Sequence, residues 1–386
     1  MNLEEQFVQL IRAYFPWVPD AYWPLVTLSL ASVFIVAAVV ERLTAIGNVL
    51  AWPFKHFFKK KPIATVVDPP PVRVLRAVWL RDRPPRPTLP KRANQSGIPI
   101  ISFINMKGGV GKTTLSANIG AHFQHLGARV LFIDFDYQGT LSLMVASAAS
   151  TDRVEANSFR LLEDSNYSEA MKHVHRFPKL ERVGLFASHY VLFRDEMQLF
   201  ANWVSEKTEY DIRYALANIL SDDELAKQWD IVVIDCGPRF TTSTINALCA
   251  STHVVIPAIL DEPSSQAVGY LSKEFQDHKT ELFPTLKLLG VIPTMIGQDP
   301  PDRQTPKFSE AETEQLDAIK RTVAQTWNEK NLILQNARIP DRAPISKHAN
   351  KIAYYENSEA KRVFARAGDI LLERLKDEGF RTSWSP

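Results

Sequence analysis

Lys107-Gly-Gly-Val-Gly-Lys-Thr-Thr114 is the stretch that decides the fold of this chain. It follows an apolar run at 98–104 and precedes a segment at 115–123 that has helical spacing. A glycine-rich turn between a buried strand and a helix lets successive backbone N–H groups point at one anion, and the N-terminus of the helix adds positive potential. The stretch therefore predicts a phosphate-binding loop.

Every residue of this loop is a candidate for contact with a nucleotide. Lys112 can reach the β- and γ-phosphates, and the hydroxyl of Thr113 can hold Mg²⁺. The common pattern G-x-x-x-x-G-K-[ST] has a glycine at position 106, but this chain has Met106 there and a second lysine, Lys107, at the start of the loop. The candidate binding residues are Lys107, Gly108, Gly109, Val110, Gly111, Lys112, Thr113 and Thr114.

Two later apolar runs end in aspartate, one in Asp134-Phe-Asp136 and the other in Asp235. Ligands of an open parallel sheet bind at the carboxyl ends of its strands, so these side chains are expected to meet Lys112 at one nucleotide. We expect Asp136 to orient the attacking water and Asp235 to support the metal. Asp134 is expected either to end its strand structurally or to lie behind the groups that contact the ligand. An N-cap is the alternative role for Asp136. The candidate metal ligands are Thr113, Asp136 and Asp235.

Length and composition fit one large α/β domain with additional segments. The chain has 386 residues, 45% of them hydrophobic, and a formal net charge of +2, so its overall charge says nothing about partners. Cys236 and Cys249 lack disulfide or metal-site spacing and are expected in the core.

Residues 21–40 contain no charged side chain and predict a transmembrane helix, because about 20 apolar residues span a bilayer core. A buried core helix and a signal peptide are the alternatives, although the residues before the run are net acidic. Basic residues follow the run, which places the N-terminus outside and the remainder in the cytoplasm, at the inner membrane.

A basic, proline-rich linker occupies 41–97. It contains 12 Lys or Arg and three Asp or Glu, and its basic residues lie close to the predicted span. Attraction to anionic lipid is the favoured role. DNA binding and a merely solvated linker are the alternatives. Part of this segment, 72–80, is expected either to pair as a short strand or to cover the core.

The remaining segments were interpreted from their spacing. Residues 252–257, 286–293 and 331–334 predict further strands of the sheet, and 146–228 is expected to be mainly helical. Residues 309–330 predict a solvated surface helix, and 359–375 predict a helix packed on the core. Basic residues near the C-terminus are mixed with acidic ones, so this region is expected to form either a DNA-binding face or a solvated surface.

These motifs together resemble the ParA/MinD family of deviant Walker-A ATPases, which includes partition proteins. The loop at 107–114 matches the family signature in full, and the resemblance extends over about 98–379. Asp134-Phe-Asp-Tyr-Gln-Gly139 resembles the D-x-D-P-Q-G element, with Tyr137 in place of proline. Asp235-Cys-Gly-Pro238 resembles the D-x-P-P switch, with Gly237 replacing a proline.

The resemblance implies an α/β P-loop NTPase with a mostly parallel, doubly wound sheet flanked by helices, preceded here by one transmembrane helix. It implies ATP and Mg²⁺ as ligands, with Pro340 at the adenine. It also implies that Lys107 crosses to the phosphates of a second copy, so that ATP controls a homodimer; a solvated loop lysine is the alternative. Lys107, Lys112 and Asp136 are then the catalytic candidates.

The expected organisation is an outer segment at 1–20, a span at 21–40, a linker at 41–97 and an ATPase domain at 98–386. The expected function is that of a membrane-anchored, slow, partner-stimulated ATPase that recruits or positions a partner complex or DNA. A ParB-like activator or an effector is the expected protein partner. A membrane-linked P-loop kinase of the bacterial tyrosine kinase type is an alternative, although the tail at 380–386 has no tyrosine. A non-hydrolysing assembly module is another.

Overall fold

The computed structural model describes residues 78–80, 97–297, 307–327, 331–341, 345, 347 and 350–384. All of them lie in a compact unit that begins at Val72. The predicted span at 21–40 and most of the predicted linker fall outside the described residues. Within the described part, no helix has the length and apolar character needed to cross a membrane.

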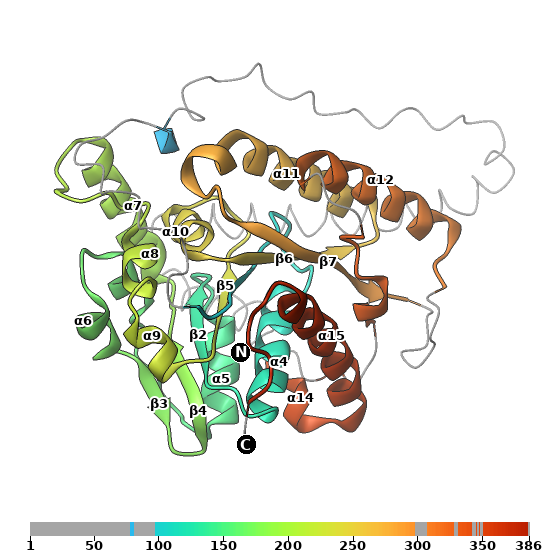
Figure 1. Cartoon of the computed structure of the whole chain (residues 1–386), viewed down its shortest axis with the longest axis horizontal. Coiled ribbons are helices and arrows are strands. Elements are labelled where there is room, and N and C mark those ends of the chain that lie inside the picture. The colour runs from blue at the N-terminus through green and yellow to red at the C-terminus, as the bar shows by residue number, and fades with distance from the viewer. Residues whose placement is uncertain are drawn as a thin grey trace, which may run out of the picture. The chain divides into compact units, whose positions relative to one another are not determined.

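A single sheet with the strand order β3-β4-β2-β5-β1-β6-β7-β8 forms the centre of the molecule (Figure 1). All neighbouring pairs are parallel except β3 with β4. The strands are β1 (Ile100–Phe103), β2 (Val130–Phe135), β3 (His175–Phe177), β4 (Leu180–Phe186), β5 (Ile231–Cys236), β6 (His253–Ile259), β7 (Lys287–Ile296) and β8 (Ile339–Pro340).

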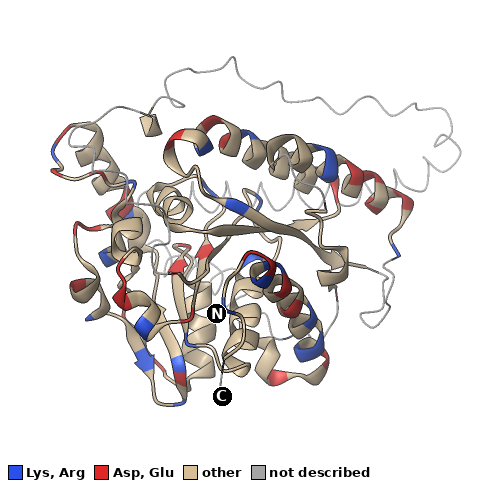
Figure 2. Cartoon of the chain, viewed as in Figure 1, with Lys and Arg blue, Asp and Glu red and all other residues tan. Residues whose placement is uncertain are grey.

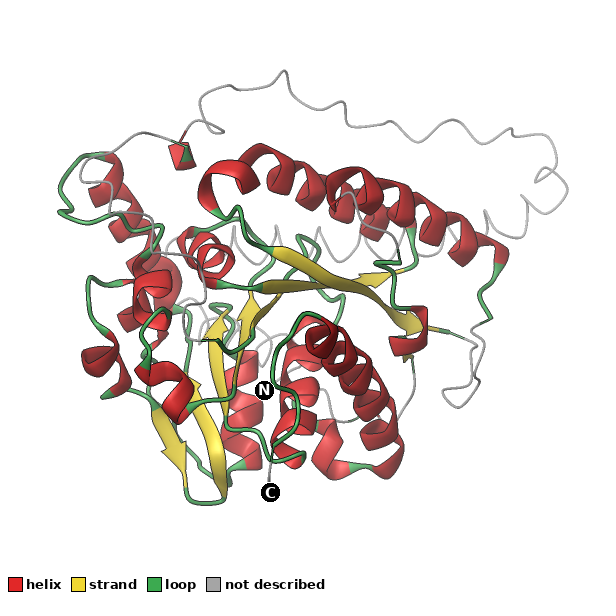
Figure 3. Ribbon diagram, viewed as in Figure 1, coloured by secondary structure: helices red, strands yellow, loops and turns green. Residues whose placement is uncertain are grey.

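Helices cover both faces of the sheet, which makes three layers (Figure 3). The core on one face includes α7 (Val191–Val204), α8 (Ala215–Leu220), α10 (Thr242–Ala250), α11 (Glu262–Leu282) and α12 (Glu310–Trp327). The core on the other face includes α4 (Lys112–His125), α5 (Thr140–Ala148), α14 (Ala353–Glu356) and α15 (Ser358–Asp377). Shorter elements are η2 (Ser158–Leu162), α6 (Tyr167–Met171), α9 (Glu224–Gln228) and η3 (Gln335–Ala337).

The central strands are apolar throughout because both of their faces are covered. In β2, every residue is buried, and Leu131 and Ile133 belong to the core on one face while Val130 and Phe132 belong to the core on the other. Successive side chains of a strand point to opposite faces, so a strand between two helical layers needs apolar residues at each position. The same holds for β5, which is buried along its whole length.

Several predictions about the outer elements are corrected or confirmed. The expected strand at 331–334 is reduced to a bridge between Val291 and Ile333, and the last strand is the two-residue β8. The region 146–228 includes the β3–β4 hairpin as well as helices. Helix α12 is not merely solvated, because a stripe of its side chains is buried against α11. Both cysteines are buried and have free thiols, as expected.

Helix α15 packs on the core, as predicted. Its stripe of buried residues includes Val363, Phe364 and Leu371, all in the core that also contains α4. Figure 2 shows basic and acidic side chains interspersed along this helix rather than a face of one sign. The mixture is typical of a solvated outer surface.

Residues 78–80 of the predicted linker cover part of the core. Val78 is buried within the core that contains α7 and α10, and Trp79 and Leu80 pack against that core. The described residues of this segment form a helical turn rather than a strand. Residues 72–80 were expected either to pair as a short strand or to cover the core, and the described part covers the core.

Strand order brings the predicted strand ends together. β5 lies between β1 and β2, and its Asp235 is in register with Phe103 on one side and with Asp134 on the other. The glycine-rich loop leaves β1 at this same edge. The aspartates and the loop are thus neighbours because of the parallel register.

Candidate functional site

The glycine-rich loop joins β1 to α4 and has the backbone conformation of an anion-binding turn. Gly109 and Gly111 have φ angles of 73° and 89°. Residues other than glycine rarely adopt this backbone conformation. Helix α4 begins directly after Gly111, so its N-terminal N–H groups face the space that the loop surrounds. The loop thus combines a concave backbone with a helix N-terminus, as the sequence predicted.

Side chains from neighbouring elements hold the loop in this shape. Asn105 accepts a hydrogen bond from the Lys107 backbone N–H at 2.9 Å, and its amide donates to the Pro257 carbonyl of β6 at 2.7 Å. The hydroxyl of Thr294 in β7 donates to the Val110 carbonyl at 2.9 Å. Two strands therefore fix the loop from outside, and the anion-binding shape exists without a ligand.

Lys112 lies buried at the start of α4, with its ammonium directed back into the loop. Nζ donates to the Lys107 carbonyl at 2.9 Å. Burial lowers the pKa of Lys112, and the carboxylates of Asp235 and Asp136 oppose that effect. The ammonium is placed where a phosphate above the loop would gain a charge-assisted hydrogen bond.

Asp235 is a fully buried carboxylate at the carboxyl end of β5. Neither of its oxygens has a hydrogen-bond partner among the residues that the structure describes. Burial raises its pKa well above the usual range, and so does the nearby Asp134, while Thr113 and Lys112 act to lower it. An orphaned buried carboxylate is costly, so this position fits a carboxylate whose partner is a hydrated cation.

Asp134 and Asp136 have different surroundings although only one residue separates them. Asp134 accepts hydrogen bonds from the Ser142 N–H at 2.9 Å, the Ser142 hydroxyl at 2.7 Å and the Asp136 N–H at 3.1 Å. Burial raises its pKa to about 7. Its oxygens are engaged with the start of α5, which confirms the structural role predicted for it.

Asp136 is a buried carboxylate just after the end of β2. One of its oxygens accepts from the Gln138 N–H at 3.0 Å, and α5 begins only at Thr140, so the residue closes a local turn and does not cap that helix. A Cβ added at Gly237 would lie 3.7 Å from the carboxyl carbon of Asp136. The Asp136 carboxylate is therefore a direct neighbour of the segment that follows Asp235.

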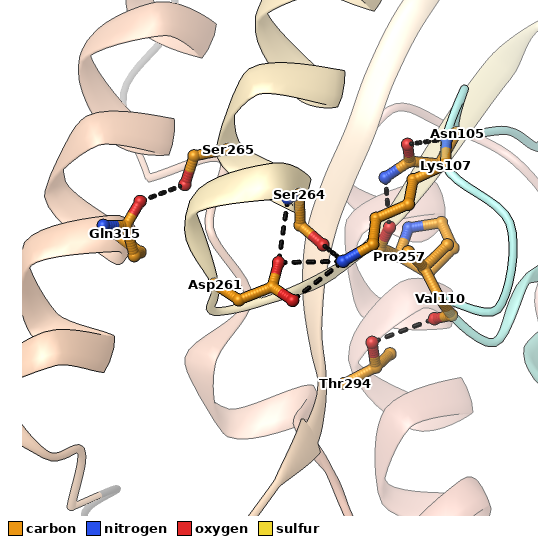
Figure 4. Close-up of polar contacts among 9 residues, drawn as sticks. All are labelled: Asn105, Lys107, Val110, Pro257, Asp261, Ser264, Ser265, Thr294 and Gln315. Atoms are coloured by element: carbon orange, nitrogen blue, oxygen red, sulfur yellow. Dashed lines mark hydrogen bonds and ion pairs between the residues drawn. The ribbon is translucent and has the colours of Figure 1, made fainter. Parts of the chain in front are cut away.

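Lys107 is held by the same chain in this structure (Figure 4). Its Nζ lies 3.0 and 2.8 Å from the two carboxylate oxygens of Asp261 and 3.0 Å from the Ser264 hydroxyl. Asp261 is also the N-cap of α11, since it accepts from the Ser264 N–H at 2.8 Å. Partial burial acts to raise the pKa of Asp261, but Lys107 and Ser264 lower it overall. The reading of Lys107 as a merely solvated loop lysine is therefore wrong.

A cavity of about 200 Å³ lies beside the loop. Pro340 of β8 lines it together with Gly111 and Thr114, which places the predicted adenine-side residue next to the loop. Met295 lines it too and has a φ of 56°, at the point where the β7–β8 pairing shifts register. A positive φ at a residue other than glycine strains the backbone, and strained residues are common at ligand-binding sites.

The described residues contain no group of three or more His, Cys, Asp or Glu side chains arranged to hold a metal ion. The predicted metal ligands are two buried carboxylates, Asp136 and Asp235, and the hydroxyl of Thr113. Mg²⁺ usually keeps several waters and binds through one or two carboxylates and the phosphates of its substrate.

The chain was next compared with known proteins. Residues 98–288 match the family model described as an AAA domain. Over 199 residues the chain is 30% identical to the sporulation initiation inhibitor protein Soj of Bacillus subtilis, covering 51% of this chain and 72% of Soj. This chain belongs to the ParA/MinD-type family of P-loop ATPases.

Solved structures give the same fold for this ParA/MinD-type chain. An ATP complex of Cyanothece McdA aligns with a TM-score of 0.56 and 18% identity, over 72% of this chain and 97% of McdA. Cobyrinic acid a,c-diamide synthase from Mycobacterium smegmatis, with a bound ATP analogue and magnesium, aligns with a TM-score of 0.52 and 25% identity, over 75% of this chain and 99% of the synthase. Other curated relatives are matched over 65% of their own length.

The sequence analysis of this ParA/MinD-type chain missed four residues of the site. Asn105 and Thr294 hold the loop, Asp261 holds Lys107, and Met295 lines the cavity beside Pro340. A signal for Asp261 was present, because it follows the apolar strand β6 just as Asp134 and Asp235 end theirs. The other three carry no pattern that sets them apart.

Proposed function

We propose that this chain is a membrane-anchored ParA-like ATPase that binds ATP with Mg²⁺, hydrolyses it slowly, and forms an ATP-dependent homodimer that recruits or positions a partner complex or DNA. The observation that carries the proposal is the buried, unpartnered carboxylate of Asp235 beside a preformed phosphate loop. Both features are costly unless a ligand completes them.

Different residues of the site are proposed to bind the phosphates, the metal and the base. The N–H groups of Gly108 to Lys112 hold the phosphates, and the Lys112 ammonium lies between them and the carboxylates behind it. Thr113 and Asp235 supply an oxygen pair for the metal, directly or through water. Bound Mg²⁺ would neutralise charge that develops on the phosphates. The cavity lined by Pro340 receives the base; pockets for whole ligands are usually 300–1,000 Å³, so 200 Å³ suits one part of a nucleotide.

Asp136 is the residue proposed to orient the attacking water. Its carboxylate lies near that of Asp235, and one oxygen remains for a water after the bond to Gln138. Phosphoryl transfer depends mainly on positioning and charge stabilisation, so a single carboxylate and Lys112 are a sparse but sufficient set. A sparse set is consistent with slow turnover that a partner would accelerate.

Lys107 is proposed as the residue that makes dimerisation depend on ATP. One ammonium cannot contact Asp261 of its own chain and the phosphates of a second copy at once. The contact with Asp261 is thus the resting arrangement, and the phosphates of a partner compete for the lysine. After hydrolysis the anionic target is lost and Lys107 returns to Asp261, which loosens the dimer.

Membrane attachment is a separate element of the proposal, supported by the uncharged run at 21–40 and the basic residues after it. The N-terminus would lie outside, the ATPase domain in the cytoplasm, and the basic linker near anionic lipid. Fractionation tests this directly: full-length protein is expected in the membrane pellet after a high-salt wash. Recovery in the soluble fraction would refute the anchor and leave the ATPase assignment standing.

The ATPase assignment is tested by phosphate release from the full-length protein. Lys112→Ala is expected to abolish nucleotide binding. Lys107→Ala is expected to keep binding but lose the ATP-dependent dimer, as measured by light scattering. Lys320→Ala is a matched control, since Lys320 lies exposed on α12 and pairs with Asp317 away from the loop. An unaltered dimer and unaltered hydrolysis in Lys107→Ala would rule out the role in trans.

A further inference from the structure

Trp79, in the predicted linker, occupies an aromatic site on the ATPase domain. Its ring stacks on Trp203 of α7 at 5.8 Å between centroids and 21° between planes, and lies 5.2 Å from Phe200 of the same helix. In Figure 1 the short blue segment that contains Trp79 lies close to α7. The linker therefore meets the domain well before the sheet begins at Ile100.

The backbone carbonyl of Trp79 is also bound by the domain. Arg213 donates from its guanidinium to the Trp79 carbonyl. This guanidinium is buried, pairs with Asp211 through Nε at 2.8 Å, and lies 5.4 Å over the Trp203 ring. A buried, charge-compensated guanidinium that donates to a backbone carbonyl is a specific contact. Trp79 is thus fixed by its ring and by its backbone.

Trp79 and the segment that follows Asp235 both line one cavity of about 350 Å³. Val78 lies beside Trp79 in this lining, and Phe240 and Thr241 come from the later segment. The ring of Phe240 is half-buried and lies 5.6 Å from that of His278 in α11. Aromatic and aliphatic side chains make up about half of the lining, and Glu196, Glu274 and His278 also line the cavity.

The segment 237–241 connects this cavity to the nucleotide site. It begins at Gly237, which is a direct neighbour of Asp136, and it ends at the cavity wall. The apolar side chains that face this cavity, Trp79 and Phe240 among them, lack dispersion contacts on that side. A shift of 237–241 that moves Phe240 toward Trp79 would recover these contacts.

We propose that docking of Trp79 is coupled to the nucleotide state through Phe240, so that nucleotide binding closes the cavity and tightens the hold on the linker. The proposal rests on the nucleotide-binding function proposed above. Coupling between two sites is reciprocal, so a docked Trp79 strengthens nucleotide binding by the same factor. Pulling the linker away from the domain would then weaken the hold on nucleotide.

The test uses the full-length protein in detergent, with a fluorescent ADP analogue as the probe. Trp79→Ala is expected to raise the dissociation constant of the analogue about 5-fold or more, the lower end of usual coupling factors. Trypsin supplies a second readout, because Arg76 and Arg81 flank Trp79. Nucleotide is expected to slow cleavage there in the wild type and to have no effect on its rate in Trp79→Ala.

Two variants serve as controls. Trp79→Phe keeps an aromatic ring and is expected to restore most of the affinity. Trp384→Ala makes the same substitution at a half-buried tryptophan that packs on Phe123, on the other face of the sheet, and is expected to change neither readout.

The outcomes separate the two proposals. A wild type that does not bind the analogue overturns the nucleotide function, and the coupling with it. A wild type that binds, beside a Trp79→Ala variant with unchanged or tighter affinity, overturns the coupling alone. An equal loss of affinity in Trp384→Ala would show a general loss of stability and would also overturn it.

Discussion

Asp261→Asn should tighten the proposed ATP-dependent dimer by freeing Lys107 from its own chain. Asparagine keeps the N-cap hydrogen bond to the Ser264 N–H, since the two side chains cap helices about equally well. It removes the carboxylate charge that holds the Lys107 ammonium at 2.8 Å. The substitution therefore separates the ion pair from the helix cap.

The size of the expected change in dimer affinity follows from how exposed the Lys107–Asp261 ion pair is. The side chains of Lys107 and Asp261 are 26% and 42% exposed, so solvent screens the pair and its contribution is about 0.5–1 kcal/mol. Two protomers release one lysine each when they dimerise. The gain is then about 1–2 kcal/mol, which corresponds to a roughly 5- to 30-fold lower dimer dissociation constant.

The assay is sedimentation of the protein with ATP and Mg²⁺ in an Asp136→Ala background, which is expected to slow hydrolysis. Asp261→Ala is the companion variant, because it loses the cap as well as the charge and should lose about 1 kcal/mol of unfolding free energy. A dimer constant that stays unchanged or rises in Asp261→Asn would refute the competition between Asp261 and the partner's phosphates.

Three further outcomes are expected. Thr294→Val leaves the buried Val110 carbonyl without its donor, so nucleotide affinity measured by fluorescence should fall about 5-fold, whereas unchanged affinity would mean that the loop holds its shape alone. Gly120→Ala places a methyl group 2.3 Å from the Phe132 ring and should cost about 1–3 kcal/mol of unfolding free energy in urea, while Gly269→Ala, with open space around it on α11, should gain about 0.5–1 kcal/mol. Hydrogen bonding to His253 and contact with Lys287 lower the pKa of Glu378 to about 2, so its contribution to folding stability is present above pH 4.5 and is lost as pH falls toward 2. Glu378→Gln should therefore cost about 1 kcal/mol of unfolding free energy at pH 7, and an equal difference from the wild type at pH 2 would contradict this.

The inner part of the fold was predictable because its signals are local. β1, the loop and α4 follow one another in the chain, and the apolar runs that end in Asp134 and Asp235 are buried on both faces. Parallel register then brings their ends together, a general property of such sheets. The positions of Lys112 and Asp134 at one edge of the sheet could be predicted for that reason.

The contact between Lys107 and Asp261 could not be predicted in the same way. The two residues are 154 positions apart, and they meet because β6 is the neighbour of β1 in the strand order. The helical turn at 78–80 contacts Trp203 and Arg213, and Arg213 lies 134 positions from Trp79 in the chain. At 331–334 the apolar run was read as a strand, but only Ile333 pairs, and its neighbours fill the space beside β7.

The two ends of the sheet affect how copies of this protein can meet. The outer strands β3 and β8 have three and two residues, so each offers very few unpaired backbone groups. Short edges are poor templates for adding a strand from another molecule. Crowded copies would therefore make contact through side chains at their surfaces and not through continuous backbone pairing, and the dimer proposed above would be of this kind.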